Sequence, residues 1–276
     1  MHDLDGLGFE KDILGRFEDM LIGGEGIILV SGPTGSGKTT TLYSTLNKMD
    51  KHDINIVTIE DTIEFDLENI NQAQVNTKSG VTFASALRSI LRQDPDIIMV
   101  GEVRDEETVE LGIRAALTGH LVFSTVHTND AASGFTRLLN WNVEPFLIAS
   151  TVKGILAQRL VRRVCKECRQ PYEASEDELR MIGLEPQDSF EAFKGKGCLA
   201  CRNTGFKGRI GIYELLLVDA EISELVLEQA PGYKIREQAR KNGMRTLLED
   251  GIIKINRGDT TISEVYETLG TTKIII

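Results

Sequence analysis

The chain contains a glycine-rich run whose residue types and spacing suit the binding of a phosphate chain. Residues 32–39 follow the pattern G-x-x-x-x-G-K-[ST], between an apolar stretch at Ile27–Val30 and a helical pattern at Thr40–Met49. Backbone N–H groups of such a loop surround a β-phosphate, while Lys38 adds a positive charge and Thr39 offers a hydroxyl to Mg²⁺. The alternative is a chance glycine-rich turn, which would not require the flanking strand and helix. The expected nucleotide-binding residues are Gly32, Pro33, Thr34, Gly35, Ser36, Gly37, Lys38, Thr39 and Thr40.

Carboxylates follow two further apolar stretches. Glu102 comes shortly after Ile97–Val100, and Glu60 comes directly after Ile54–Ile59. Ligands of open parallel sheets bind at the carboxyl ends of the strands, so we expect Glu102 to polarise the attacking water. We also expect Glu60 and Glu102 to hold Mg²⁺ together with Thr39. The alternative for both carboxylates is a solvated position at a strand end.

Two histidines flank a fourth apolar stretch, Leu121–Val126. His127 follows it at the same edge as the carboxylates, so we expect it to contact the γ-phosphate as a catalytic residue. His120 opens the stretch at the opposite edge, where a structural role is equally compatible with the sequence.

The four cysteines form two C-x-x-C pairs, Cys165 with Cys168 and Cys198 with Cys201. Each pair can bring two thiolates to one metal, and two pairs complete a closed tetrahedral Zn²⁺ site. The alternatives are a redox pair, which lacks a thioredoxin-like setting, and unrelated buried thiols, which would not predict paired spacing. The stretch 172–197 between the pairs is polar and is expected to be helical, so the metal would hold this region together.

Parallel β-strands joined by crossover helices are the elements expected to position these residues. The apolar stretches are continuous and lie some 20 or more residues apart. This pattern is typical of buried parallel strands in an α/β sheet. An amphipathic helix is expected before Gly23-Gly24, and helices are expected from Asp219 onward. A capping box is expected at Thr261–Glu264. No account follows for the apolar end at 271–276.

Composition excludes several classes of protein. The 276 residues carry a formal charge of −11, which argues against general nucleic-acid binding. The apolar runs are far shorter than the ~18 residues of a membrane-spanning helix. Sparse cysteines and no N-terminal secretion signal favour a reducing cytoplasmic setting. Basic residues crowd the approach to the first cysteine pair, which suggests a basic face for a neighbouring subunit or a platform protein; they are Arg159, Arg162, Arg163, Lys166 and Arg169.

Several long motifs in this order resemble the Walker A, Asp box, Walker B and His box of the secretion ATPases, which drive type IV pili and type II secretion. The motifs are 32–43 (GPTGSGKTTTLY), 58–61 (TIED), 86–96 (ALRSILRQDPD), 101–105 (GEVRD), 118–130 (TGHLVFSTVHTND), 156–160 (LAQRL) and 208–214 (GRIGIYE). By position, Glu60 and Asp61 match the Asp box, Glu102 the Walker B glutamate, and His120 and His127 the His box.

The resemblance implies an ATP-hydrolysing RecA-like P-loop NTPase core that assembles as a homo-hexamer in the cytoplasm. Such rings act on an inner-membrane platform protein at the inner face of the cytoplasmic membrane, peripheral to the membrane rather than spanning it. The expected division is an ATPase core at 1–160, a tetracysteine zinc-binding insertion at 161–207, a returning core strand at 208–218 and a C-terminal helical segment at 219–276. Family members carry further N-terminal domains, so we expect a C-terminal fragment.

The tetracysteine insertion resembles that of the pilus-assembly and type II secretion motors, whereas the pilus-retraction motors lack it. We therefore expect a motor for type IV pilus assembly, with type II secretion as the alternative. A RecA-like nucleic-acid translocase shares the phosphate loop, but the acidic charge, the His box and the cysteine pairs count against it. One departure from the family is Thr62, where proline is expected. An arginine finger is expected among Arg88, Arg92, Arg104 and Arg114 without a preference, although most of these are expected to form ion pairs.

Overall fold

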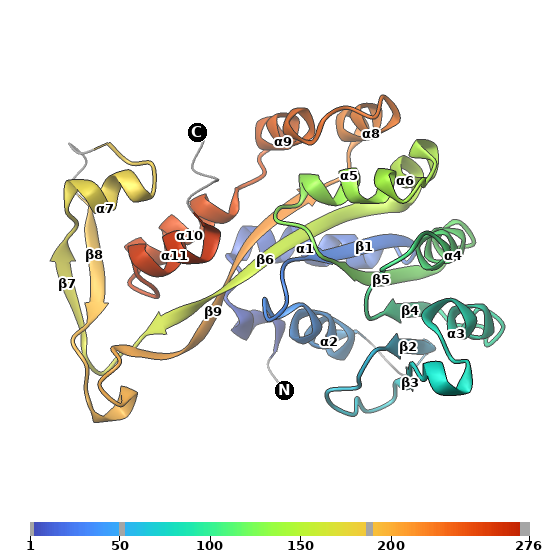
Figure 1. Cartoon of the computed structure of the whole chain (residues 1–276), viewed down its shortest axis with the longest axis horizontal. Helices are drawn as coiled ribbons and strands as arrows, with labels where there is room; N and C mark the ends of the chain where they lie inside the picture. Colours follow the sequence, from blue (N-terminus) through green and yellow to red (C-terminus); the bar gives the residue numbers. More distant parts are fainter. Residues whose placement is uncertain (1–2, 50–52, 186–189, 271–276) are drawn as a thin grey trace.

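A seven-stranded β-sheet forms the centre of the molecule, with the strand order β3-β2-β4-β5-β1-β6-β9 (Figure 1). The computed structural model describes residues 3–49, 53–185 and 190–270, so the apolar end at 271–276 lies outside the described residues. Neighbouring strands are parallel except for β6 and β9, which are antiparallel. The strands of this sheet are β1 (Gly26–Ser31), β2 (Ile56–Glu60), β3 (Asn71–Gln74), β4 (Ile97–Val100), β5 (Leu121–Val126), β6 (Val152–Val164) and β9 (Phe206–Leu217).

Helices cover both faces of the sheet, which explains why its central strands are apolar on both sides. One face packs on α1 (Lys11–Ile22) and α2 (Lys38–Lys48). The other face packs mainly on α3 (Phe83–Ile90), α4 (Glu106–Leu117), α5 (Ala132–Asn140), α6 (Pro145–Thr151), α8 (Ala220–Leu227), α9 (Gly232–Lys241), α10 (Leu247–Asn256) and α11 (Ile262–Leu269). The chain therefore has a mixed α/β fold with a largely parallel sheet.

The four strands expected in the first half are present, but two parts of the sheet were not expected. β3 at the edge is polar, because its side chains remain largely exposed there. β6 runs across residue 160, where a domain boundary was expected, and it reaches Val164. One long strand thus belongs both to the core sheet and to the approach to the first cysteine pair. Glu60 is the last residue of β2 rather than the residue after it.

The region between the cysteine pairs contains a two-stranded antiparallel sheet of β7 (Arg169–Glu173) and β8 (Glu191–Gly195). The expectation of a helical stretch at 172–197 is therefore wrong for most of its described part, since only α7 (Glu176–Met181) is an α-helix there. β6 and β9 run side by side from the central sheet to this region (Figure 1).

Helices follow Asp219 as expected, and Asp219 itself caps α8. Only half of the expected capping box at Thr261–Glu264 forms. The Thr261 hydroxyl accepts from the Glu264 N–H, but the Glu264 carboxylate accepts from the backbone and the guanidinium of Arg162 on β6. The contact with Arg162 has thus replaced the hydrogen bond that Glu264 would make within the capping box. No helix among the described residues is long and apolar enough to cross a bilayer.

Candidate functional site

The loop between β1 and α2 takes a shape that only glycine permits at two positions. A Cβ on Gly32 would lie 2.4 Å from the Ser36 Oγ and 2.6 Å from the Gln158 carbonyl oxygen. Gly37, directly before α2, has a φ of 89°, which side chains rarely allow. The Ser36 hydroxyl oxygen is buried and has no hydrogen-bond partner within the described part of the chain. The loop therefore leaves donor capacity for a bound group.

Lys38 reaches back across this loop. Its Nζ donates hydrogen bonds to the carbonyl oxygens of Gly32 at 2.9 Å and Pro33 at 3.0 Å. Burial lowers the pKa of the Lys38 ammonium group, and the nearby Glu102 carboxylate opposes that effect. The ammonium thus lies over the hollow of the loop, where a phosphate could replace the carbonyls as its acceptor.

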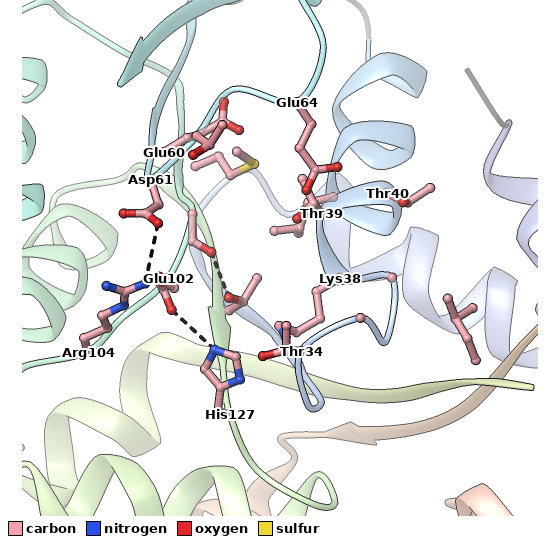
Figure 2. A pocket seen from close by; sticks show the side chains of 18 of the residues that line it. Thr34, Lys38, Thr39, Thr40, Glu60, Asp61, Glu64, Glu102, Arg104 and His127 are labelled. Atoms are coloured by element: carbon pink, nitrogen blue, oxygen red, sulfur yellow. Dashed lines mark hydrogen bonds and ion pairs between the residues drawn. The ribbon is translucent and has the colours of Figure 1, made fainter. Parts of the chain in front are cut away.

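A cavity of about 480 Å³ opens beside the loop at the carboxyl ends of the strands (Figure 2). Of the residues expected to bind nucleotide, Gly32, Pro33 and Ser36 are not among those that line it. The other expected loop residues line the cavity together with Glu60, Glu102 and His127. The structure therefore brings the expected loop, carboxylate and histidine residues together. Figure 2 shows Lys38 and Thr39 across the cavity from Glu102 and Asp61.

Glu102 lies between two cationic or ionisable partners (Figure 2). Its carboxylate forms an ion pair with Arg104 and lies 3.3 Å from the Nε2 of His127. Arg104 also lies 3.7 Å from Asp61, and the ion pair with Glu102 raises the pKa of the Arg104 guanidinium. The Glu102 side chain is only 14% exposed, so these contacts hold it at the wall of the cavity.

Glu60 is enclosed by hydrogen-bond donors. Its carboxylate accepts from the hydroxyls of Tyr43 and Thr58 and from the Gln72 Nε2 at 3.1 Å. The residue is 2% exposed. Burial, reinforced by the hydrogen bond to Glu60, raises the pKa of Tyr43. The contacts of Glu60 thus join β2, α2 and β3, and its expected role with Mg²⁺ stays a prediction.

His120 lies at the opposite end of β5 from His127. Its Nδ1 lies 2.8 Å from the Ala115 carbonyl oxygen and 3.1 Å from the Thr118 hydroxyl, at the end of α4. These contacts indicate a structural role. Three of the four arginines considered above form ion pairs, as expected: Arg88 with Glu107, Arg104 with Glu102, and Arg114 with Glu110.

The four cysteine sulfurs converge within 4.8 Å of one another. The Cys165–Cys198, Cys168–Cys201 and Cys198–Cys201 sulfur distances are 3.8, 3.9 and 3.7 Å. Four sulfurs placed tetrahedrally about 2.3 Å from a zinc ion lie about 3.8 Å apart. The cluster therefore fits a tetrahedral Zn²⁺ ion in both donor chemistry and spacing.

Most of the basic residues before the cysteines have partners inside the chain. Arg159 is buried, while Arg162 pairs with Glu264 and Arg163 with Asp259. Arg169 donates to the carbonyl oxygens of residues 257 and 258 and lies over the Phe193 ring. Of the five residues expected to form a basic face, four thus contribute mainly to internal contacts.

Several residues near the loop lie inside the family motifs 156–160 and 208–214, but no role at the site was assigned to them from the sequence. Leu160 of β6 and Arg209 of β9 line the cavity. Gln158 contacts the loop directly through its side chain. The available signal was a polar pair, Gln158-Arg159, inside an otherwise apolar run at 155–161. A second cavity of about 830 Å³ adjoins the first and shares Gly37, Thr40, Glu64, Leu160 and Arg209 with it.

Comparison with known proteins places these features in a family. The model of the family "Type II/IV secretion system protein" matches residues 1–267. The chain is 48% identical over 265 residues to the type IV pilus assembly ATPase PilB of Thermus thermophilus, covering 95% of this chain and 30% of that protein. It is 45% identical over 263 residues to the type II secretion system ATPase E of Vibrio cholerae, covering 95% of this chain and 52% of that protein.

The structure agrees with the sequence comparison. The pilus retraction motor PilT with bound ADP superposes with a TM-score of 0.72 at 29% identity, covering 99% of this chain and 68% of that one. The chain spans from under a third to about half of the length of the two curated relatives. The phosphate loop, the acidic strand ends and the cysteine pairs thus occur in a chain that belongs to the type II/IV secretion system protein family.

Proposed function

We propose that this chain is the ATP-hydrolysing part of a hexameric motor that powers type IV pilus assembly. The observation that carries the proposal is the cavity into which Lys38, Thr39 and Glu102 converge. It combines a loop shaped for phosphate with a carboxylate placed to act on water, and the adjoining cavity offers room for a nucleoside. A RecA-like P-loop core is the architecture that this arrangement supports.

Each site residue has a role in this proposal. The loop residues and Thr40 bind the phosphates, and the Thr39 hydroxyl together with Glu60 and Glu102 holds Mg²⁺. When bound there, Mg²⁺ would neutralise charge on the phosphate oxygens. Glu102 accepts the proton of the attacking water, and Arg104 and His127 hold its carboxylate in place. His127 is close enough to Glu102 to respond to a γ-phosphate beside it.

The tetracysteine cluster supports a structural Zn²⁺ site formed by Cys165, Cys168, Cys198 and Cys201. We assign residues 161–207 to a tetracysteine subdomain, 1–160 and 208–218 to the ATPase core, and 219–276 to a C-terminal helical segment. In this division β6 and β9 cross both boundaries of the subdomain. A zinc ion held by the four cysteines would join the two ends of the insertion, since one pair follows β6 and the other precedes β9.

A ring of six copies in the cytoplasm, acting on an inner-membrane platform protein, is the assembly that we propose by analogy with the family. Nucleic acid is not a proposed partner, since the formal charge is −11. The chief alternative is a type II secretion motor, which the identity to the Vibrio cholerae protein favours about as strongly as pilus assembly.

Deletion of the gene in its own organism separates the two systems. Loss of surface pili with normal protein secretion supports pilus assembly, and loss of secreted proteins with intact pili supports type II secretion. A salt-titrated DNA-binding assay tests the remaining class. Tight binding with a steep salt dependence would contradict both motor assignments.

A further inference from the structure

Gln158 lies on β6 directly beside the phosphate loop. β1 and β6 pair in parallel, and the last pair joins Ser31 to Ala157. The next residues, Gly32 and Gln158, are so close that a Cβ on Gly32 would lie 2.6 Å from the Gln158 carbonyl oxygen. The Gln158 residue is 1% exposed. This polar side chain is therefore fully enclosed between β6 and the loop.

Both ends of the Gln158 amide are hydrogen-bonded. Its Nε2 donates to the Ser36 carbonyl oxygen at 2.7 Å, and the Thr41 hydroxyl donates to its Oε1 at 2.9 Å. Because a carbonyl oxygen can only accept, the NH₂ group must face Ser36, and the amide has one orientation. One side chain thus links the phosphate loop to the first turn of α2.

The bond to Ser36 fixes the peptide plane that precedes α2. The C=O and N–H of a trans peptide point in opposite directions, so a Ser36 carbonyl held toward β6 turns the Gly37 N–H away from β6. Gly37 lines the phosphate cavity, and its φ of 89° lies in the left-handed region, which glycine adopts about as readily as negative φ. Because the glycine backbone does not select one orientation by itself, the hydrogen bond from Gln158 helps to hold this peptide plane.

We propose that Gln158 is a positioning residue, which aims the Gly37 N–H at the phosphate of the bound nucleotide. This inference rests on the nucleotide site proposed above and adds to it a residue that acts on the phosphate through the Ser36–Gly37 peptide. In this arrangement the loop's donors are held in place before the phosphate arrives, so binding does not require the peptide plane to reorient.

Arg159 fixes the Gln158 backbone from the other face of β6. Its guanidinium donates to the Gln158 carbonyl oxygen at 2.9 Å and to the Asn129 carbonyl oxygen at 2.7 Å. Burial lowers the pKa of Arg159, while Glu214 and Asp130 oppose that effect. Asn129 follows His127 by two residues. The same guanidinium therefore holds the strand beside the phosphate loop and the segment after β5.

Replacement of the amide tests the proposal. Gln158→Met keeps the length of the side chain and removes the donor, and Gln158→Leu removes the donor with a shorter, branched apolar side chain. We expect both variants of the full chain to bind Mg-ADP about tenfold more weakly, since one donor to a charged phosphate loses its alignment. The dissociation constant is measured by titration well below the unfolding temperature of every variant.

A matched control separates positioning from general destabilisation. Val161→Ala shortens a buried apolar side chain on the same strand, three residues after Gln158. Val161 belongs to the apolar cluster on one face of the sheet, whereas Leu156 belongs to the cluster on the other face. The variant should lower the thermal unfolding midpoint and leave the Mg-ADP affinity within about twofold. Equal losses of affinity in Val161→Ala and Gln158→Met at equal stability would overturn the proposal.

The remaining outcomes are equally decisive. Affinity within about twofold of wild type in either Gln158 variant would overturn the proposal, because the donor would then be dispensable. Lys38→Ala serves as the test of the nucleotide site itself. If Lys38→Ala binds Mg-ADP normally, the proposed function fails. If it loses affinity while the Gln158 variants do not, only the positioning role fails.

Discussion

The central sheet and the cysteine cluster are organised in opposite ways. The sheet is stabilised by apolar side chains on both faces, and the residues proposed to act on the nucleotide lie at the edge of that core. In the cluster the chemically active residues are themselves buried, since Cys165, Cys168 and Cys201 form a small core of their own. A metal ion would have a different purpose in each place: an open Mg²⁺ site serves chemistry, and a closed Zn²⁺ site serves folding.

This difference predicts different responses to mutation. A site residue at the edge of a large apolar core can be replaced with loss of activity and little loss of structure. A buried ligand in a cluster made of cysteines cannot be replaced without local unfolding. The following experiments test whether the two regions differ in this way and by how much.

Replacement of Glu102 should give the largest effect. Glu102→Gln removes the proposed general base and keeps the shape of the side chain, so ATP hydrolysis should slow by about 10²–10⁴-fold while ATP still binds. Steady-state phosphate release and nucleotide titration measure the two quantities. Glu107→Gln, which changes an exposed carboxylate paired with Arg88, is the control and should retain wild-type turnover. Unchanged turnover in Glu102→Gln would remove this residue from the mechanism.

Replacement of Lys38 should act on binding rather than on folding. Lys38→Ala removes the positive charge over the loop, and we expect about a hundredfold loss of Mg-ADP affinity, or roughly 2.7 kcal/mol. The unfolding temperature should change little. Lys48→Ala, at the far end of α2 and paired with Glu18, provides the matched control. If Lys38→Ala instead unfolds the protein, a residue at the phosphate loop would be needed for folding as the cysteines are, and the proposed difference between the two regions would be wrong.

Removal of zinc should affect structure and spare binding. Metal analysis is expected to find about one Zn per chain by the four-thiolate rule. Chelation or Cys198→Ser should speed proteolysis between residues 165 and 205 by about tenfold or more, while Mg-ADP affinity stays within about twofold. Metal-free protein that resists the protease as well as the holoprotein does would show that the cysteines are not the core of their region.

The ion pair between Arg162 and Glu264 should give the smallest effect, since it joins the two regions at one point. Burial raises the pKa of the Glu264 carboxyl, but the hydrogen bonds and the charge of Arg162 outweigh that effect and hold the pKa below its ordinary value. A lowered pKa stabilises the fold above the unfolded-state pKa, and that contribution is lost as the pH falls through the folded-state pKa. The stabilisation should therefore decline as the pH falls below the ordinary pKa of a glutamate, about 4.3.

Denaturant midpoints at pH 6 and pH 3.5 check the role of Glu264. Glu264→Gln should narrow the difference between the midpoints at the two pH values, whereas Glu224→Gln, an exposed change on α8, should leave it as in wild type. If the two denaturant midpoints of Glu264→Gln differ as much as those of the wild type, protonation of Glu264 does not change the stability of the fold.

The features that could be predicted from the sequence are those set by local pattern. The strands β1, β4 and β5 are continuous apolar runs, so their bounds could be read within a residue. The phosphate loop and the cysteine pairs have fixed spacing, and the structure brings each of them together. Ligands of open parallel sheets bind at the carboxyl ends of the strands, and this rule correctly predicted that Glu102 and His127 lie at one cavity.

Long-range contacts set the features that could not be predicted. β3 is a strand only because it pairs with β2. The Glu264 carboxylate leaves its local cap for Arg162, and Glu60 is enclosed by donors from three elements. Gln158 lies in the motif 156–160, but its role could not be read there because that role depends on the register of β6 beside β1. In each case the partner lies far away in the sequence.

The antiparallel pair β6 and β9 has a mechanical consequence. The two strands are hydrogen-bonded along most of their length and leave the sheet together (Figure 1). From Gln158 to Cys165 the chain advances about 20 Å at the usual strand rise. If the strand pair tilts as a rigid unit by about 5° beside the phosphate loop, the first cysteine is displaced by about 2 Å.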